Sequence, residues 1–190
     1  MIYPVYGYGA GVLKREAKEI EEDYANLKQL VADMYETMYE ANGVGLACPQ
    51  IGVSIRMFVI DTEQLDEEGD EPVGVKKVFI NPIIVEEEGT EWDYEEGCLS
   101  IPDLTSDVTR KPKIVVEYYD EDFNLKEESY DGMNARVIQH ETDHLDGILF
   151  TDHISGFKRR LMKRKLENIK KGRIDVDYRM KFAVDLKKRK

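Results

Sequence analysis

The segment QHETDHLDG at residues 139–147 has the residue types and the spacing of a metal-dependent hydrolase. On a helix, residues four apart lie on the same face, so His140 and His144 can bind one ion. Glu141 is rotated by about 100° from His140, so it stands beside the ion without binding it. A bound divalent metal lowers the pKa of its water toward ~7, and a nearby carboxylate can take the proton as a carbonyl is attacked.

The alternative is an ordinary surface helix that carries two histidines by chance. Two observations favour the metal site. The helix has the apolar neighbours Val137, Ile138 and Leu145, and the whole chain has only three histidines.

A catalytic site of this kind needs a third protein ligand and an open position. The segment follows the metzincin motif HExxHxxGxxH as far as its glycine, but Phe150 stands where the last histidine is required. His153 lies three residues too far along, and Glu167 is expected on the solvent-exposed face of a basic helix. Cys48 and Cys98 remain, because thiolates bind soft and borderline metals well. Spacing does not choose between them, and an inert buried cysteine is the alternative for each.

Apolar periodicity predicts the elements that position these residues. One helix is expected from a possible N-cap at Asp23 to a stop at Asn42-Gly43. A second is expected over 131–145, with Asp131 as its N-cap and Gly147 as its end. A third is expected over about 155–171. Strands are expected at 56–61, 77–85 and 113–120, with an exposed acidic loop at 62–74. Because the strands cluster before the histidine helix instead of alternating with helices, an α+β domain is predicted.

Composition and length indicate a soluble, single-domain protein of the cytosol, either an enzyme or a binding protein. The chain has 190 residues, 42% hydrophobic and 35% charged, enough for one hydrophobic core. Its apolar runs are far shorter than the roughly 20 residues of a membrane span, its start lacks a signal-peptide pattern, and two cysteines are too few for a disulfide scaffold.

Charge divides the chain into an acidic body and a basic end. Residues 157–190 contain 15 Lys and Arg against 4 Asp and Glu, a balance of +11, which leaves −23 on the first 156 residues. An acidic body repels nucleic acid, so no DNA binding is expected, whereas the basic end could contact RNA locally. A solvated tail that aids solubility is the alternative.

Three motifs together resemble a known family. GVGLACPQ at 43–50, EGCLS at 96–100 and QHETDHLDG at 139–147 are similar to the signature motifs of bacterial peptide deformylase, in the same order and at similar spacing. The likeness runs from about Val12 to the last helix. It implies antiparallel β-sheets packed around a central helix that carries HExxH, with a C-terminal helix. It also implies one catalytic domain at 1–171, followed by a basic tail at 172–190.

The resemblance implies a function and a set of site residues. The family removes the formyl group from the formyl-methionine of nascent polypeptides and releases formate. Carried over by position, the metal ligands are Cys98, His140 and His144. The catalytic residues are Glu141 as general acid and base, Gln50 through its side-chain amide, and Leu99 through its backbone N–H, which stabilise the oxyanion. The expected substrate-binding residues are Val44, Gly45, Tyr94, Gly97 and Val137, and Glu96 and Gln139 are expected to orient the metal ligands.

Two positions depart from the family pattern. Cys48 stands where alanine is usual and adds a thiol that could lie near the metal. Thr105 stands where some members have an arginine that contacts substrate, so the preference beyond methionine could differ. Neither departure removes a catalytic group.

The resemblance further implies one divalent metal ion, Fe(II) in the cell, with Zn(II), Ni(II) or Co(II) in preparations. The expected partners are N-formylmethionyl peptides and the ribosome near its exit tunnel, which the basic C-terminal helix would contact; no membrane partner is expected. Two alternatives are an HExxH zinc peptidase and a non-catalytic metal-binding protein. A purely structural site has no use for Glu141 and Gln50, which counts against the second alternative.

Overall fold

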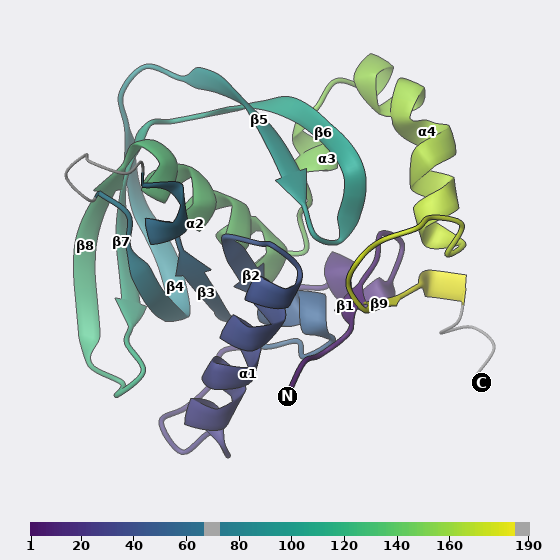
Figure 1. Ribbon diagram of the computed structural model, residues 1–190. Helices are drawn as coiled ribbons and strands as arrows, with labels where there is room; N and C mark the ends of the chain where they lie inside the picture. Colours follow the sequence, from purple (N-terminus) through teal and green to yellow (C-terminus); the bar gives the residue numbers. More distant parts are fainter. Residues whose placement is uncertain (67–72, 185–190) are drawn as a thin grey trace.

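The computed structural model describes residues 1–66 and 73–184 (Figure 1). Its helices are α1 (Leu27–Glu40), α2 (Gly132–Leu145), α3 (Phe150–His153) and α4 (Gly156–Lys170), with 3-10 turns η1 (Gly11–Lys14), η2 (Cys48–Ile51) and η3 (Glu63–Leu65). Its strands are β1 (Val5–Tyr6), β2 (Gly45–Ala47), β3 (Met57–Asp61), β4 (Lys76–Glu88), β5 (Trp92–Cys98), β6 (Ile101–Arg110), β7 (Lys113–Tyr119), β8 (Leu125–Asp131) and β9 (Met180–Lys181). The predicted α+β class is confirmed.

A five-stranded antiparallel sheet, in the order β2-β3-β4-β7-β8, forms the body of the molecule. Strand β3 is buried along its whole length because helices cover both faces of the sheet. Phe58 and Ile60 pack in the core cluster that includes α2, whereas Met57 and Val59 pack in the cluster that includes α1. Alternate residues of a strand point to opposite faces, so one short apolar run serves both layers.

Helix α2 begins and ends close to where the sequence predicts. Asp131 is its N-cap residue, and Gly147, with φ of +71°, follows its last turn in a left-handed conformation that glycine adopts readily. Ala135, Ile138 and Leu145 of this helix are buried in the core cluster of the sheet. That packing sets the rotation of α2, so the residues of its other face have a defined direction.

A long two-stranded hairpin, β5–β6, forms a separate sheet that arches beside α2 (Figure 1). Neither strand is among those predicted from the sequence. β5 reads WDYEEGC and β6 reads IPDLTSDVTR, so charged and polar residues interrupt the apolar ones. In β6, Ser106, Val108 and Arg110 are buried while the residues between them are exposed. The period of two is present, but polar side chains on the buried face obscure it.

Helix α1 starts at Leu27 and not near Asp23. Its N-cap residue is Asn26, which has φ of 59° in the left-handed region and whose side chain makes no capping hydrogen bond. Asparagine tolerates this conformation better than most residues, so the chain can turn sharply just before the helix. The acidic loop expected at 62–74 begins with the single turn η3, and its residues 67–72 lie outside the described residues.

Helix α4 forms where the sequence predicts the last helix, and it packs on the body through one apolar face. Leu166 and Ile169 are buried and Met162 packs beside them, in a cluster formed with β6 and α3. After α4 the chain returns to the N-terminus, where β9 pairs with β1 in a parallel register. Figure 1 shows the two terminal strands side by side below α4. Within the described ranges, no helix is both long and apolar enough to cross a membrane.

The aromatic cluster between the sheet and α2 provides a test of this core. Phe79 is fully buried. The centroid of its ring lies 4.8 Å from the ring centroid of Phe58 and 4.3 Å from that of Tyr118. Phe79→Ala is expected to lower the free energy of unfolding by about 3–5 kcal/mol, because it leaves a cavity in a packed core. Urea denaturation measures the change. Val85→Ala, at a half-exposed position of the same strand, is the control and should change stability by less than about 0.5 kcal/mol.

Candidate metal centre

Three side chains from two elements converge to form a metal-binding group. His140 and His144 lie one turn apart on α2, with ring centroids separated by 5.0 Å. Cys98 ends β5, and its Sγ lies 3.2 Å from Nε2 of His144. One ligand atom from each of the three residues lies within 4.8 Å of the others. The structure therefore selects Cys98 as the third ligand, which spacing in the sequence could not do.

The other candidates for the third ligand lie elsewhere. Cys48 is fully buried against the sulfur of Met34, 3.3 Å away, in the core under α1, so its thiol does not line the metal site. His153 contacts Asp143 through Nε2 (2.7 Å). Glu167 lies within 3.7 Å of two lysine side chains on its own helix. None of these residues joins the group of three ligands.

The ligand group has the geometry and the charge state that a divalent metal needs. A tetrahedral ion with a metal–sulfur distance of about 2.3 Å and metal–nitrogen distances of about 2.0–2.1 Å holds its sulfur and nitrogen ligands roughly 3.5 Å apart. The observed 3.2 Å between Cys98 and His144 is close to this value. Burial disfavours the thiolate of Cys98, but the neighbouring His144 and His140 outweigh burial and lower its pKa to about 5. The thiolate is the form that binds metal.

A buried carboxylate, Glu96 of β5, orients His140. Nδ1 of His140 lies 3.0 Å from Oε2 of Glu96. Burial raises the pKa of Glu96, but hydrogen bonds from His140 and Arg110 outweigh it and hold that pKa well below its usual value. An ionised carboxylate only accepts hydrogen bonds, so Nδ1 of His140 donates. This leaves Nε2 of the same ring directed at the metal position.

Two arginines that the sequence analysis missed complete this ion network. Arg110 of β6 donates to both oxygens of Glu96, at 2.7 and 3.0 Å. Arg136 of α2 donates to Glu96 Oε1 at 2.9 Å, and all three side chains are buried. Both had a weak signal in the sequence. Arg110 alternates in phase with Val108, and Arg136 lies four residues before His140 on the same helix face. Gln139 was expected to share the orienting role, but its amide donates to two backbone carbonyls and does not contact the ligands.

Glu141 is buried beside the ligands with one carboxylate oxygen, Oε2, that has no hydrogen-bond partner among the described residues. Burial raises its pKa to about 7, against the opposing influence of the two histidines. The first motif makes room for this carboxylate, because a Cβ at Gly45 would lie 2.5 Å from Oε1 of Glu141. A glycine is therefore required at position 45 for a steric reason.

Gln50 links the first motif to the second. Its Oε1 accepts a hydrogen bond from the backbone N–H of Ala47 at 2.8 Å, which fixes the orientation of the amide within η2. Its Nε2 is then directed at the second motif, 3.3 Å from Oγ of Ser100 and 3.6 Å from Sγ of Cys98. The amide donor therefore lies directly beside the ligand sulfur.

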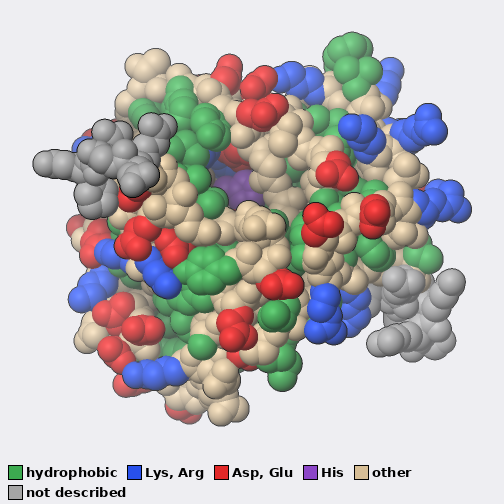
Figure 2. Space-filling view, in the orientation of Figure 1, with side chains coloured by type: hydrophobic (Ala, Val, Ile, Leu, Met, Phe, Trp, Pro, Cys, Tyr) green, Lys and Arg blue, Asp and Glu red, His purple; other side chains and the backbone are tan. Residues whose placement is uncertain are grey.

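A cavity of about 510 Å³ opens onto this group, and His140 and Glu141 form part of its wall. Figure 2 shows the hollow near the middle of this face, with a histidine side chain visible at its base. Leu99 and Thr105 line the cavity, and so do all the residues predicted to bind substrate, which are Val44, Gly45, Tyr94, Gly97 and Val137. Val137 is 7% exposed and Tyr94 is 41% exposed, so one lies deep in the wall and the other at the rim.

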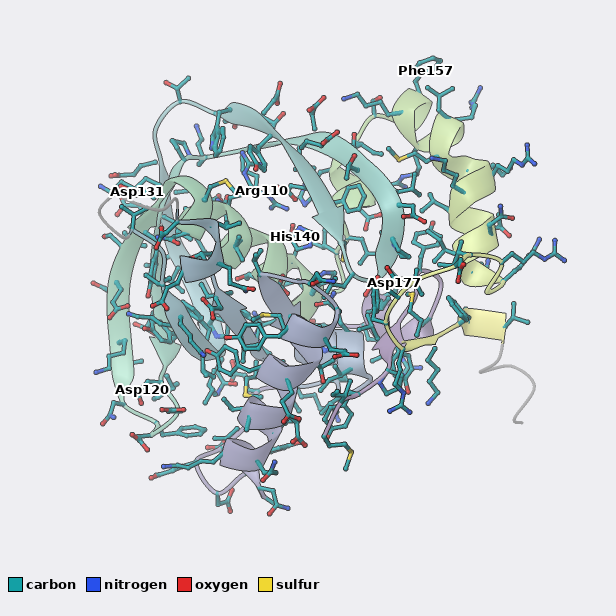
Figure 3. All side chains as sticks on the ribbon, in the orientation of Figure 1. Arg110, Asp120, Asp131, His140, Phe157 and Asp177 are labelled. Carbon is teal, nitrogen blue, oxygen red and sulfur yellow. The ribbon has the colours of Figure 1, made fainter. Side chains whose placement is uncertain are left out.

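The arrangement suits hydrolysis of an amide. Three ligands, of which His144 is buried and Cys98 and His140 are partly buried, surround one point together with a buried carboxylate and an amide donor. This point opens to a cavity lined mainly by apolar and backbone groups. Figure 3 shows His140 near the centre of the molecule, between α2 and the β5–β6 hairpin, with Arg110, the last residue of β6, above it. A ligand group that only stabilised the fold would not need this open side.

Comparisons with known proteins agree with the site. The family model described as polypeptide deformylase matches residues 2–160. The chain is 54% identical to a peptide deformylase of Flavobacterium johnsoniae, over the full length of both chains, and 53% identical to one of Cytophaga hutchinsonii, over 97% of this chain and 99% of that protein. The crystal structure of the peptide deformylase of Thermus thermophilus is similar with a TM-score of 0.80 at 42% identity, covering 90% of this chain and 99% of that one.

The two cysteines provide the test of the ligand set. Cys98→Ser is expected to reduce bound metal at least tenfold, because it replaces the ligand thiolate with a weakly binding hydroxyl. Cys48→Ala should retain about one equivalent of metal, because the thiol of Cys48 lies in the core under α1 and not at the metal site. Metal analysis of the two purified variants and the parent protein decides the matter. Loss of metal from the Cys48 variant with retention by the Cys98 variant would reverse the assignment.

Proposed function

This chain belongs to the polypeptide deformylase family, and from that membership we propose the part that each residue plays in removing the formyl group from new polypeptides. The reaction hydrolyses the formamide of an N-terminal formyl-methionine and releases formate. The observation that carries the proposal is the Cys98, His140 and His144 group at the base of an open cavity. Family membership sets aside the two alternatives, an HExxH peptidase and a non-catalytic metal protein.

One divalent metal ion fits the ligand group. When bound, it polarises the formyl oxygen and lowers the pKa of a water molecule. A set of two imidazoles and one thiolate suits several borderline metals, and availability often decides which is bound. We propose Fe(II) in the cell, with Zn(II), Ni(II) or Co(II) in preparations.

Glu141 is proposed as the general acid and base. It receives the proton of the attacking water and passes it to the amine that leaves. Its burial supports this role, because a carboxyl whose pKa is raised to about 7 exchanges protons readily near neutral pH. The nearby Gly45 brings backbone groups of the first motif against the same carboxylate, on the side of the cavity where the substrate binds.

Gln50 and the backbone N–H of Leu99 are proposed to stabilise the oxyanion of the tetrahedral intermediate. Preformed donors in a desolvated site stabilise a developing negative charge more than water does. The amide of Gln50 is held by Ala47 and directed at the Cys98–Ser100 turn, which supports its role as such a donor.

The cavity wall is proposed to bind the N-formylmethionyl peptide. Val44 and Gly45 offer backbone groups to the peptide as an added strand. Tyr94 and Val137 are proposed to line the space for the methionine side chain, and Gly97 is proposed to bind substrate from the same cavity wall. Thr105 also lines the cavity and takes the place of the arginine found in some relatives, so the preference beyond methionine is expected to differ from theirs.

We place the protein in the cytoplasm, where polypeptide synthesis supplies its substrate. Its catalytic domain is proposed to span 1–171, followed by a basic C-terminal tail at 172–190. Part of that tail packs on the domain, since β9 pairs with β1 and Tyr178 lines the cavity, and residues 185–190 lie outside the described residues.

Helix α4 is proposed to bind the ribosome near the exit tunnel. Its apolar face is buried against the body, so Arg160, Lys163 and Arg164 are left exposed on the outer side. Figure 2 shows basic side chains gathered along this side of the molecule. Figure 3 shows Phe157 at the N-terminal end of α4, where its side chain is exposed. A positive surface on an otherwise acidic protein is complementary to ribosomal RNA.

A single substitution tests the catalytic assignment. The parent protein is expected to release formate from formyl-Met-Ala-Ser and to leave unformylated Met-Ala-Ser intact. Glu141→Gln should retain its metal and its melting temperature but lose about 10²–10⁴-fold in turnover, which is the usual contribution of a general acid–base group. Turnover near the parent value at neutral pH would remove Glu141 from the mechanism. Cleavage of the unformylated peptide would point to a peptidase instead.

Reversing charges on α4 tests ribosome binding without altering the metal site. Lys163→Glu combined with Arg164→Glu is expected to reduce co-sedimentation with ribosomes at low salt and to flatten its salt dependence, because fewer counterions are released. Turnover of the small formyl peptide should not change. The control, Arg15→Glu combined with Lys18→Glu, alters the net charge equally at exposed positions away from α4. If both double variants sediment as the parent does, α4 is only a solvated face.

A further inference from the structure

The chain segment that follows α4 returns to the catalytic cavity. Gly172, with φ of +65°, turns the chain back after the helix. Six residues later Tyr178 lines the same cavity as Glu141, and its hydroxyl donates to the backbone carbonyl of Leu99 at 2.7 Å. Figure 3 shows the neighbouring Asp177 on this segment, beside the tip of the β5–β6 hairpin. A residue from the C-terminal segment therefore contacts the second motif directly.

Backbone pairing with the N-terminus holds this segment in place. The N–H of Val5 donates to the carbonyl of Arg179 at 2.8 Å, and that of Gly7 donates to Lys181 at 3.0 Å. A Cβ at Gly7 would lie 3.2 Å from Cε of Met180, so the two strands pack closely there. Arg179, which accepts the first of these bonds, is next to Tyr178, so the backbone that carries Tyr178 is held against the N-terminal segment.

The turn that Tyr178 contacts is held from other sides as well. The carbonyl of Ser100 accepts a hydrogen bond from the N–H of Tyr8 at 2.8 Å. The amide of Gln50 approaches Oγ of Ser100 at 3.3 Å. Tyr8, near the N-terminus, therefore donates to the carbonyl of Ser100, and Tyr178, near the C-terminus, donates to the carbonyl of Leu99. Of these two bonds, only the one from Tyr178 comes from a side chain, so a single substitution can remove it without altering the backbone.

We propose that Tyr178 is a positioning residue for the deformylation reaction. By holding the Leu99 carbonyl, its hydroxyl fixes the turn and so directs the Leu99 N–H at the oxyanion, an inference that rests on the proposed role of that N–H. Donors contribute most when their direction is set before the reaction and needs no rearrangement during it. Tyr178 acts through the turn and not on the reacting atoms, so its loss should affect the transition state more than substrate binding.

The test removes one oxygen atom. Tyr178→Phe keeps the ring, and its kcat for formyl-Met-Ala-Ser, per bound metal ion, is expected to fall about 3- to 10-fold, the range for losing one neutral hydrogen bond. KM should stay within about twofold and the metal content should not change. Tyr6→Phe is the matched control. Its hydroxyl accepts from Lys181 Nζ at 2.8 Å within the same terminal pairing, away from the turn, so its loss should leave kcat and KM unchanged.

Hydrogen–deuterium exchange adds a readout that does not depend on activity. The peptide spanning residues 97–102 should exchange faster in Tyr178→Phe than in the parent, and at the parent rate in Tyr6→Phe. An unchanged kcat and exchange rate would overturn the proposal. So would a rise in KM alone, which would place Tyr178 on the substrate, or a lower melting temperature with normal kcat per metal ion, which would make its role purely structural. If the parent protein released no formate, the proposed function would fail, and exchange would still decide whether Tyr178 holds the turn.

Discussion

The carboxylate of Glu96 joins the two parts of the metal centre. Cys98 comes from the hairpin and the two histidines come from α2, and these elements belong to different layers of the fold. Glu96 lies two residues before Cys98 and contacts His140, while Arg110 and Arg136 bind it from β6 and α2. One buried anion therefore sets the position of the hairpin relative to the helix. The distance between the thiolate and the imidazoles depends on it.

Such a network is demanding because its members are interdependent. A buried charge that loses its partner costs about 3–5 kcal/mol. Here one carboxylate binds two guanidinium groups with little exposure, so a second carboxylate is needed to balance their charge. Asp143 extends the arrangement by accepting from Arg110 at 2.8 Å. The histidine helix therefore carries two kinds of groups on neighbouring faces. One kind binds the metal, and the other kind aligns the helix with the hairpin.

The first motif meets this centre through a steric constraint. Gly45 leaves the space that the Glu141 carboxylate occupies, and Gly43 leaves the space for the side chain of Leu99, where a Cβ would lie 2.8 Å from Cδ1. Gln50, held by Ala47, then approaches the Cys98–Ser100 turn. Three separate segments of the chain thus surround one point. The segments next to the terminal strands hold the same turn, since Tyr8 and Tyr178 both donate to its carbonyls.

The sequence by itself determined the α+β class, the histidine helix with its caps, the last helix and its apolar face, and, through three motifs, the family and the ligand set. These features are local, because each depends on the spacing of residues within one helix or one short motif. Only the tertiary structure decided the rest. It revealed β5 and β6, whose buried faces carry Ser106 and Arg110, and it placed Arg110 and Arg136 around Glu96. It separated Cys48 from the metal site and brought Tyr178 into the cavity. These contacts join residues distant in the chain, and a charged side chain looks the same in sequence whether it faces solvent or a buried partner.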